Sequence, residues 1–248
     1  MIGVRAGLLT AATGLVVLLG GLAVAPGIGE GIGALGVAVG LASGAVLSTA
    51  ATRGARQAGV QRWGPADVVT LARATLACGV AALVADAAVG DPAVPVLVAL
   101  AAVALALDAV DGRVARRTGT ASPLGGRIDG EADAFLMLVL SVHVAAQVGA
   151  WVLAIGLVRY AFAVAGWVLP WMRADLPPRH WRKVVTAVSG IALVVAAADA
   201  GPAGASYAAL GLAALGLAES FGRDVGWLWR RREVRSTVVA SPAGLASP

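Results

Sequence analysis

Eight stretches of this chain are apolar over about the length that a helix needs to cross a bilayer, roughly 20 residues. They cover approximately residues 6–25, 31–50, 66–87, 92–110, 128–148, 151–170, 184–198 and 203–221. Hydrocarbon offers the backbone no hydrogen-bond partner, so such segments must form helices that pack together. Only 13% of the residues are charged, against about 25% in a typical soluble domain. The sequence therefore predicts an all-α, polytopic membrane helix bundle.

Lysine and arginine residues mark one side of the predicted bundle. They gather before the first segment and in alternate loops after it, in sets that begin at Arg5, Arg53, Arg113, Arg173 and Arg223. The loops of the other side have acidic residues and no Lys or Arg: Glu30, Asp86, Asp91 and Asp199. The positive-inside rule predicts that both termini face the cytoplasm, in a plasma (cytoplasmic) membrane protein. The net charge of +5 is spread over segment ends, so we expect membrane lipids and no nucleic acid as partners.

The first two segments and the residues around them allow alternatives. The first segment ends in Ala-Val-Ala at residues 23–25, as a secretory signal does, but Pro26 follows directly and favours an uncleaved anchor. Residues 51–65 carry arginines among small residues, which fits a short interfacial helix or a solvated connector. We interpret the glycines of the second segment, Gly31, Gly33, Gly36 and Gly40, as packing positions rather than as a phosphate loop. The single cysteine, Cys78, excludes an internal disulfide and is interpreted as a buried bystander.

Four of the chain's aspartates fall at helical spacing around the boundary between the fourth and fifth segments. Asp108 and Asp111 are three residues apart, and Asp129 and Asp133 are four apart. Each pair would share one face of a helix. Carboxylates crowded beside hydrocarbon repel one another unless cations or protons compensate. The sequence thus predicts an oxygen-ligand site for Mg²⁺ or Mn²⁺, with two ions clamping a diphosphate.

The residues between these pairs support a phosphate site. Gly112 and Gly125 have no side chain and would let backbone and phosphate approach closely. Arg116 adds a planar donor fork for phosphate oxygens. The alternative is a solvated, salt-bridged loop, in which Arg113, Arg117 and Arg127 would be topology determinants and headgroup contacts.

The full pattern resembles the signature of a known family. It reads D-x-x-D-G-x-x-A-R from Asp108 to Arg116, then eight residues, then G-x-x-x-D-x-x-x-D from Gly125 to Asp133. This is similar to the class I CDP-alcohol phosphatidyltransferase family, over about residues 65–221. The resemblance implies a six-helix core, usually homodimeric, that transfers a substituted phosphate from a CDP-linked lipid to an alcohol and releases CMP. It also implies that the site faces the cytoplasm.

Roles follow from the resemblance position by position. It implies that Asp108, Asp111 and Asp129 hold the metal ions and that Asp133 is both a ligand and the catalytic general base. The residues implied to bind the CDP-linked donor are Asp108, Asp111, Gly112, Ala115, Arg116 and Gly125. The segment 65–73 resembles the family's P-N-x-x-T-x-x-R, with Asp67 in place of asparagine, and this adds Thr70 and Arg73 to the donor site. A structural ion pair with an aspartate is the alternative for Arg73, because a cation inside an apolar helix needs a partner.

The acceptor alcohol is less determined. Many family members have a basic residue after the last aspartate, where this chain has Ala134. A basic set could still bind a phosphorylated alcohol such as glycerol 3-phosphate or inositol phosphate. Its members are Arg159 within the sixth segment and, in the next loop, Arg173, Arg179, Arg182 and Lys183. Topology and headgroup binding are the alternative for the loop residues.

The sequence therefore predicts a metal-dependent phosphotransferase of phospholipid biosynthesis, with a transporter or a non-catalytic membrane scaffold as alternatives. The predicted organisation has four parts. These are two N-terminal transmembrane helices (1–52), a juxtamembrane segment (53–65), the six-helix catalytic core (66–222) and a basic, partly disordered tail (223–248).

Overall fold

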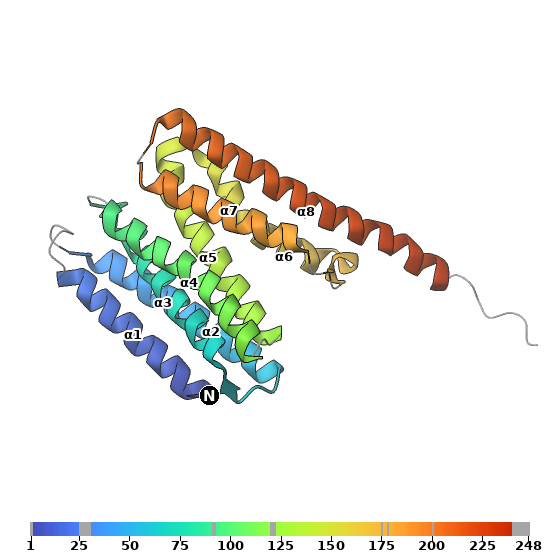
Figure 1. The fold of residues 1–248 in the computed structure, drawn as a ribbon, viewed down its shortest axis with the longest axis horizontal. Helices are drawn as coiled ribbons and strands as arrows, with labels where there is room; N and C mark the ends of the chain where they lie inside the picture. The colour runs from blue at the N-terminus through green and yellow to red at the C-terminus, as the bar shows by residue number, and fades with distance from the viewer. Residues whose placement is uncertain are drawn as a thin grey trace, which may run out of the picture.

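The computed structural model describes residues 2–24, 31–90, 93–119, 123–174, 176–177, 179–199 and 201–239. These residues form eight α-helices, two short 3-10 helices and two two-residue strands (Figure 1). The helices are α1 (Val4–Val24), α2 (Ala34–Gln57), α3 (Pro65–Asp86), α4 (Val94–Thr118), α5 (Pro123–Val148), α6 (Leu153–Val168), α7 (His180–Ala197) and α8 (Ala203–Val239). The shorter elements are β1 (Ile2–Gly3), β2 (Arg62–Trp63), η1 (Ala150–Val152) and η2 (Pro170–Arg173). The predicted all-α bundle is confirmed.

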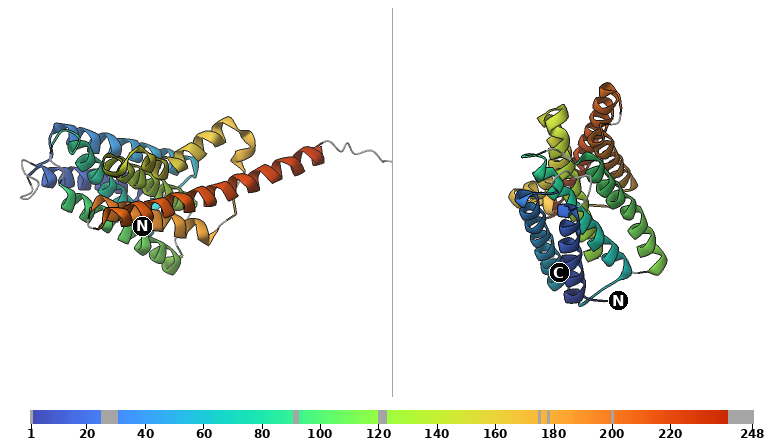
Figure 2. Two further views of the ribbon diagram at one scale, coloured as in Figure 1. Left: turned by 90° about the horizontal axis from the view of Figure 1, so that it is seen from above. Right: turned by 90° about the vertical axis from the view of Figure 1, so that its left-hand side faces the viewer.

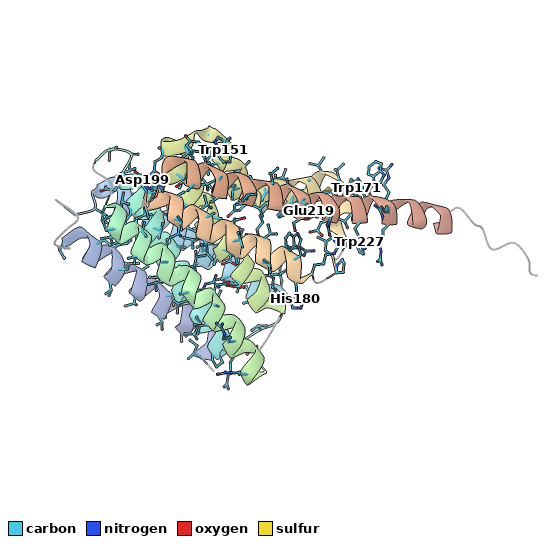
Figure 3. All side chains as sticks on the ribbon, turned by 45° about the horizontal axis from the view of Figure 1, so that its top comes forward. Trp151, Trp171, His180, Asp199, Glu219 and Trp227 are labelled. Atoms are coloured by element: carbon cyan, nitrogen blue, oxygen red, sulfur yellow. The ribbon has the colours of Figure 1, made fainter. Side chains whose placement is uncertain are left out.

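Within the described residues, six helical segments are long and apolar enough to cross a membrane. They lie in α1, α2, α3, α5, α6 with the preceding η1, and α7. The apolar part of α4 is shorter, Val94–Val110, because the aspartate-containing end of the same helix follows it. Tryptophans lie toward both ends of the bundle: Trp151 near Asp199 at one end, and Trp171 and Trp227 toward the other (Figure 3). Such aromatic positions are typical of the two interfaces of a membrane protein.

Helix α3 lies at the centre of the site-bearing half of the bundle. It packs against α1, α2, α4 and α5. Its start is well defined, because Pro65 occupies the first turn and the Asp67 carboxylate accepts a hydrogen bond of 2.8 Å from the Gly64 amide. Proline and an acidic residue both favour a helix N-terminus. The residue that departs from the family's asparagine therefore still caps the helix.

The two N-terminal helices are bonded to the core at both ends of α3. At one end β1 pairs antiparallel with β2, and Trp63 of β2 is fully buried. At the other end the Asp86 carboxylate of α3 accepts a hydrogen bond of 2.8 Å from the amide of Gly33, which precedes α2. An acidic group at this position also interacts favourably with the helix dipole. Helices α1 and α2 are thus packed parts of the bundle.

The predicted packing role of the glycines in α2 is confirmed at two positions. A Cβ atom at Gly36 would lie 2.8 Å from the Ala82 carbonyl oxygen of α3. One at Gly40 would lie 2.8 Å from a methyl group of Leu19 on α1. The missing side chains let three helices approach closely.

The alternative of a separate interfacial helix within residues 51–65 is wrong. Helix α2 continues to Gln57, and a turn then leads to β2. Ala51 and Ala55, four residues apart, are both buried. Their shared face keeps the end of α2 packed on the bundle, so the helix extends without a break.

Helix α8 is longer than the predicted segment 203–221. It continues to Val239 and extends past the other helices (Figures 1 and 2). Leu228 is buried, and the rings of Trp229 and Trp171 of η2 meet edge to face at 5.3 Å. Arg231 and Arg232 lie over the rings of Trp227 and Trp229. These contacts are made by the part of α8 that lies in the basic region of the chain. The end of the predicted tail, residues 240–248, lies outside the described residues.

Candidate active site

Three of the four predicted aspartates converge at one place. Asp108 lies on α4, and Asp129 and Asp133 lie one turn apart on α5. One carboxylate oxygen from each side chain lies within 4.8 Å of the other two. The side chains of Asp108, Asp129 and Asp133 are 37%, 33% and 23% exposed, so the cluster is open to a ligand. The predicted convergence of acidic groups from two neighbouring helices is present.

The guanidinium group of Arg73 lies against all three carboxylates. Its Nη2 is 3.0 Å from Asp108 Oδ1, and it also forms ion pairs with Asp129 and Asp133. Its Nε donates a hydrogen bond of 3.1 Å to the Ala104 carbonyl of α4. Only 3% of the Arg73 side chain is exposed. The structural ion pair with an aspartate, which was the alternative interpretation of Arg73, is therefore present. It joins α3, α4 and α5.

The ligand atoms that this cluster offers suit a divalent cation. Asp108, Asp129 and Asp133 offer only oxygen atoms, which Mg²⁺ and Mn²⁺ prefer. Three carboxylates and one guanidinium leave an excess of negative charge at the cluster. Because repulsion between neighbouring carboxylates is relieved by a cation, a metal ion would complete the charge balance that Arg73 begins.

The remaining residues of the motif lie where the two helices approach their ends. Gly112 is in α4, which ends at Thr118, and Gly125 is in α5, which begins at Pro123. The motif does span the end of one helix and the start of the next, but both helices extend beyond the predicted segments 92–110 and 128–148. Asp108 therefore lies ten residues before the end of α4, and Asp129 lies six residues after the start of α5. The side chains of three further motif residues lie outside the described part of the chain: Asp111, Ala115 and Arg116.

Thr70 lies one turn before Arg73 on α3 and is buried. Its hydroxyl donates a hydrogen bond of 3.2 Å to the Ala66 carbonyl. The position places Thr70 on the same face of α3 as Arg73, since residues three apart are neighbours on a helix.

The basic residues predicted for the acceptor make other contacts. Arg159 of α6 forms an ion pair of 2.7 Å with Glu131 of α5. Arg182 of α7 binds Asp224 of α8, with Nε 3.0 Å from Oδ2. Arg179 lies near the same carboxylate, at 4.0 Å, and Lys183 is exposed.

Two acidic residues that were not predicted as site residues therefore form ion pairs with arginines that were predicted to bind the acceptor. Asp224 is buried between α7 and α8, and Glu131 is exposed on α5. Asp224 is 42 residues from Arg182, and Glu131 is 28 residues from Arg159. In the sequence, Asp224 lies within a basic stretch and Glu131 lies between Asp129 and Asp133, and neither setting identifies the partner.

Comparison with protein families gives one match. The model of the CDP-alcohol phosphatidyltransferase family matches residues 63–218, more than half of the chain. The match covers α3 to α7 and the first part of α8, and it contains the aspartate cluster and Arg73. Helices α1 and α2 lie outside it. Comparisons with curated proteins and with solved structures give no match.

Proposed function

The chain belongs to the CDP-alcohol phosphatidyltransferase family, and we propose that it makes phospholipid from a CDP-linked lipid such as CDP-diacylglycerol. Membership implies transfer of a phosphatidyl group from a CDP-alcohol donor. The acceptor that we propose is a small phosphorylated alcohol, glycerol 3-phosphate or an inositol phosphate. The products would be a phosphodiester and CMP.

One observation carries this proposal: Asp108 of α4 and Asp129 and Asp133 of α5 meet around the buried Arg73 of α3. Simple anchoring of a membrane helix requires no such cluster, because intramembrane charges are costly and usually serve a function. The partial exposure of the carboxylates leaves the cluster accessible to a diphosphate and its metal ions.

Proton transfer is the step that we assign to Asp133. The hydroxyl oxygen of the acceptor would attack the lipid-linked phosphorus of the donor. A new P–O bond forms, the P–O bond to CMP breaks, and CMP departs with the bridging oxygen. The Asp133 carboxylate would accept the hydroxyl proton as the bond forms and later release it to solvent. Its 23% exposure provides a route for that release.

Asp108, Asp129 and Asp133 would hold the metal ions, together with Asp111. Bound Mg²⁺ or Mn²⁺ supplies charge stabilisation to the diphosphate during transfer. Arg73 would keep the three described carboxylates in place through its ion pairs. Its guanidinium group would also add positive charge near the diphosphate.

The rest of the donor and acceptor sites stays a prediction. Thr70 and Gly125 lie close in sequence to the described cluster residues and support a donor site on the same side of α3 and α5. Roles for Gly112, Ala115 and Arg116 rest on the motif. Acceptor binding by Arg179, Arg182 and Lys183 likewise rests on their charge. The ion pair with Glu131 places Arg159 on the face of α5 opposite Asp129 and Asp133, so the structure gives its predicted acceptor role no support.

We also propose the setting in which the protein works. The distribution of arginines supports a plasma-membrane protein with the cluster and both termini on the cytoplasmic side. This is the side on which CDP-linked donors are made. A homodimer is proposed from the family resemblance.

The test is CMP release from CDP-diacylglycerol by the full chain in liposomes. Glycerol 3-phosphate, inositol phosphate, inositol and serine would be compared as acceptors, with Mg²⁺, Mn²⁺ or a chelator. We expect metal-dependent release with one phosphorylated alcohol, and loss of release in Asp111→Asn. Metal-independent turnover, or full activity of Asp111→Asn, would contradict the mechanism. Solute flux across vesicles without CMP release would favour a transporter, and absence of both activity and metal binding would favour a scaffold.

A further inference from the structure

A large cavity lies between the two N-terminal helices and the core. Its volume is about 790 Å³, and α1, α2, α3, α5 and α6 line it. This volume is within the range of about 300–1,000 Å³ that is usual for small-molecule sites. Helices α1 and α2 supply more than half of the lining residues. Because these two helices lie outside the family match, the cavity is a feature that this chain adds to the shared core.

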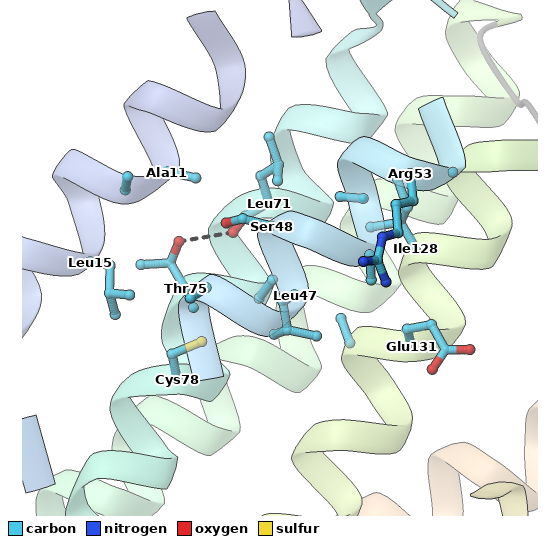
Figure 4. Close-up of a pocket in the computed structure, with 18 of the residues that line it drawn as sticks. Ala11, Leu15, Leu47, Ser48, Arg53, Leu71, Thr75, Cys78, Ile128 and Glu131 are labelled. Atoms are coloured by element: carbon cyan, nitrogen blue, oxygen red, sulfur yellow. Dashed lines mark hydrogen bonds between the residues drawn. The ribbon is translucent and has the colours of Figure 1, made fainter. Parts of the chain in front are cut away.

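The cavity has an apolar interior and a charged mouth. Leu15 of α1, Leu47 of α2 and Cys78 of α3 are among the interior residues. Four charged residues of the lining are exposed and mark its mouth: Arg53, Arg127, Arg159 and Glu131. In Figure 4, Arg53 and Glu131 lie together at one side of the cavity, and Leu15 and Cys78 lie at the other. Positive charge at the mouth thus exceeds negative charge.

This cavity is separate from the aspartate cluster. Successive residues of an α-helix are rotated by about 100°, so Asp129 and Asp133 share one face of α5 and Glu131 lies on the opposite face. Glu131 lines the cavity and pairs with Arg159 at 2.7 Å. On α3, likewise, Arg73 points to the cluster, whereas Leu71, Ala74 and Cys78 line the cavity. The described lining contains none of the three clustered aspartates.

The position of the cavity suits an amphiphile of the membrane. Its walls include α2 from Leu41 to Gln57 and the beginning of α5 from Leu124 to Ala132, so it occupies the half of the bundle nearest the arginine-rich ends. Apolar walls at this depth adjoin lipid chains, and arginines at the bilayer surface contact headgroups. Guanidinium groups bind phosphate through two parallel hydrogen bonds.

We propose that this cavity is a binding site for a membrane lipid with an anionic phosphate headgroup. The lipid chain fills the apolar interior, and the phosphate lies among Arg53, Arg127 and Arg159. Since Glu131 offsets only one of these three charges, the mouth selects an anionic headgroup over a zwitterionic one. The bound lipid joins α1 and α2 to α5, behind the aspartate cluster. This proposal does not depend on the proposed transfer reaction.

The charge requirement is tested on the full chain purified in detergent, with bound lipid counted by native mass spectrometry. Phosphatidylglycerol and phosphatidylcholine are supplied in equal amounts. We expect the wild type to retain one phosphatidylglycerol at least tenfold more than phosphatidylcholine. The double variant Arg53→Gln, Arg127→Gln should lose this preference. Arg56→Gln changes an exposed arginine of α2 outside the lining and should keep it. Equal retention of the two lipids by the wild type, or an unchanged preference in the double variant, would overturn the proposal.

The apolar part of the site is tested by filling it. Ala45→Phe places a ring in the cavity, whereas Ala42→Phe places the same ring on an exposed part of α2 outside the lining. We expect at least a tenfold loss of bound phosphatidylglycerol in Ala45→Phe alone, with melting temperatures alike. Unchanged retention by a folded Ala45→Phe variant would contradict lipid binding here. A dimer without lipid that Ala45→Phe dissociates would assign the face to a second copy of the chain and overturn the proposal.

Lipid binding here can be separated from the transfer reaction. Phosphatidylglycerol has no cytidine diphosphate, and the clustered aspartates face away from the cavity. Asp108→Asn should therefore keep the bound phosphatidylglycerol even where CMP release is lost. Loss of lipid in Asp108→Asn would place the lipid in the aspartate site and overturn the proposal. A failure of CMP release in every variant, with lipid retained, would contradict only the proposed function.

Discussion

The guanidinium group of Arg73 on α3 lies 3.0 Å from the carboxylate of Asp108 on α4. The same group forms ion pairs with Asp129 and Asp133 on α5. One cation therefore connects three helices that are consecutive in the sequence. Almost none of the Arg73 side chain is exposed. A buried charge is tolerated only when it is paired and hydrogen-bonded. Arg73 and the aspartates therefore depend on one another for their positions.

Removing Arg73 should destabilise the protein and make it respond to metal. We expect Arg73→Gln to lower the free energy of unfolding by about 3–5 kcal/mol, because the carboxylates lose their buried cation. Added Mg²⁺ or Mn²⁺ should recover part of this loss by replacing the missing positive charge. The measurement is unfolding in mixed micelles with and without metal, with Arg56→Gln as the control. A variant as stable as the wild type would contradict the structural role of Arg73.

Asp133 should contribute to the rate of transfer. Because a carboxylate that accepts the hydroxyl proton contributes about 10²–10⁴-fold, we expect Asp133→Asn to lower CMP release by a similar factor. The control is Asp86→Asn at the other end of α3, where asparagine can still cap α2 through the Gly33 amide. The assay compares initial rates at saturating donor. A rate for Asp133→Asn within threefold of the wild type would exclude Asp133 as the base.

Asp224 should stabilise the packing of α7 on α8. Arg182 binds this buried carboxylate at 3.0 Å and Arg179 lies near it. We expect Asp224→Ala to lower the free energy of unfolding by about 1–3 kcal/mol, the usual effect of losing a hydrogen-bonded charged partner. Glu219→Gln, at an exposed ion pair with Arg223, should change it by less than about 0.5 kcal/mol. Equal effects of the two substitutions in thermal unfolding would show that burial of Asp224 adds nothing.

Gly156 should be required where α6 crosses α5. A Cβ atom at this position would lie 2.6 Å from the Cα of Leu138 and 2.8 Å from the Ser141 hydroxyl. We expect Gly156→Ala to cost about 1–3 kcal/mol of stability, as overpacking of a close contact does. Gly166→Ala on the same helix meets no atom within 4 Å and should be tolerated. The two variants would be compared by melting temperature in one detergent, and equal melting would rule out the close contact.

Much of the fold follows from local features of the chain. The apolar segments placed the eight helices, and the aspartate spacing placed Asp108, Asp129 and Asp133 on helices that approach one another. Arg73 could be recognised as a cation needing a partner, because a charge within an apolar helix is costly. The end of α8 could not be placed in the same way. Its basic half stays helical through ring contacts such as that between Trp171 and Trp229, which join residues far apart in the chain.

The sequence alone determined that this chain is a helical membrane bundle with an acidic motif of one enzyme family. Helical hydrogen bonds join residues four apart, and apolarity over about 20 residues selects the membrane, so both can be recognised locally. Only the tertiary structure decided that Arg73 meets three aspartates, that Asp224 holds Arg182, and that α1 and α2 enclose a cavity against α5. These relationships depend on which helices are neighbours and how each is rotated about its axis. Packing between distant segments sets both.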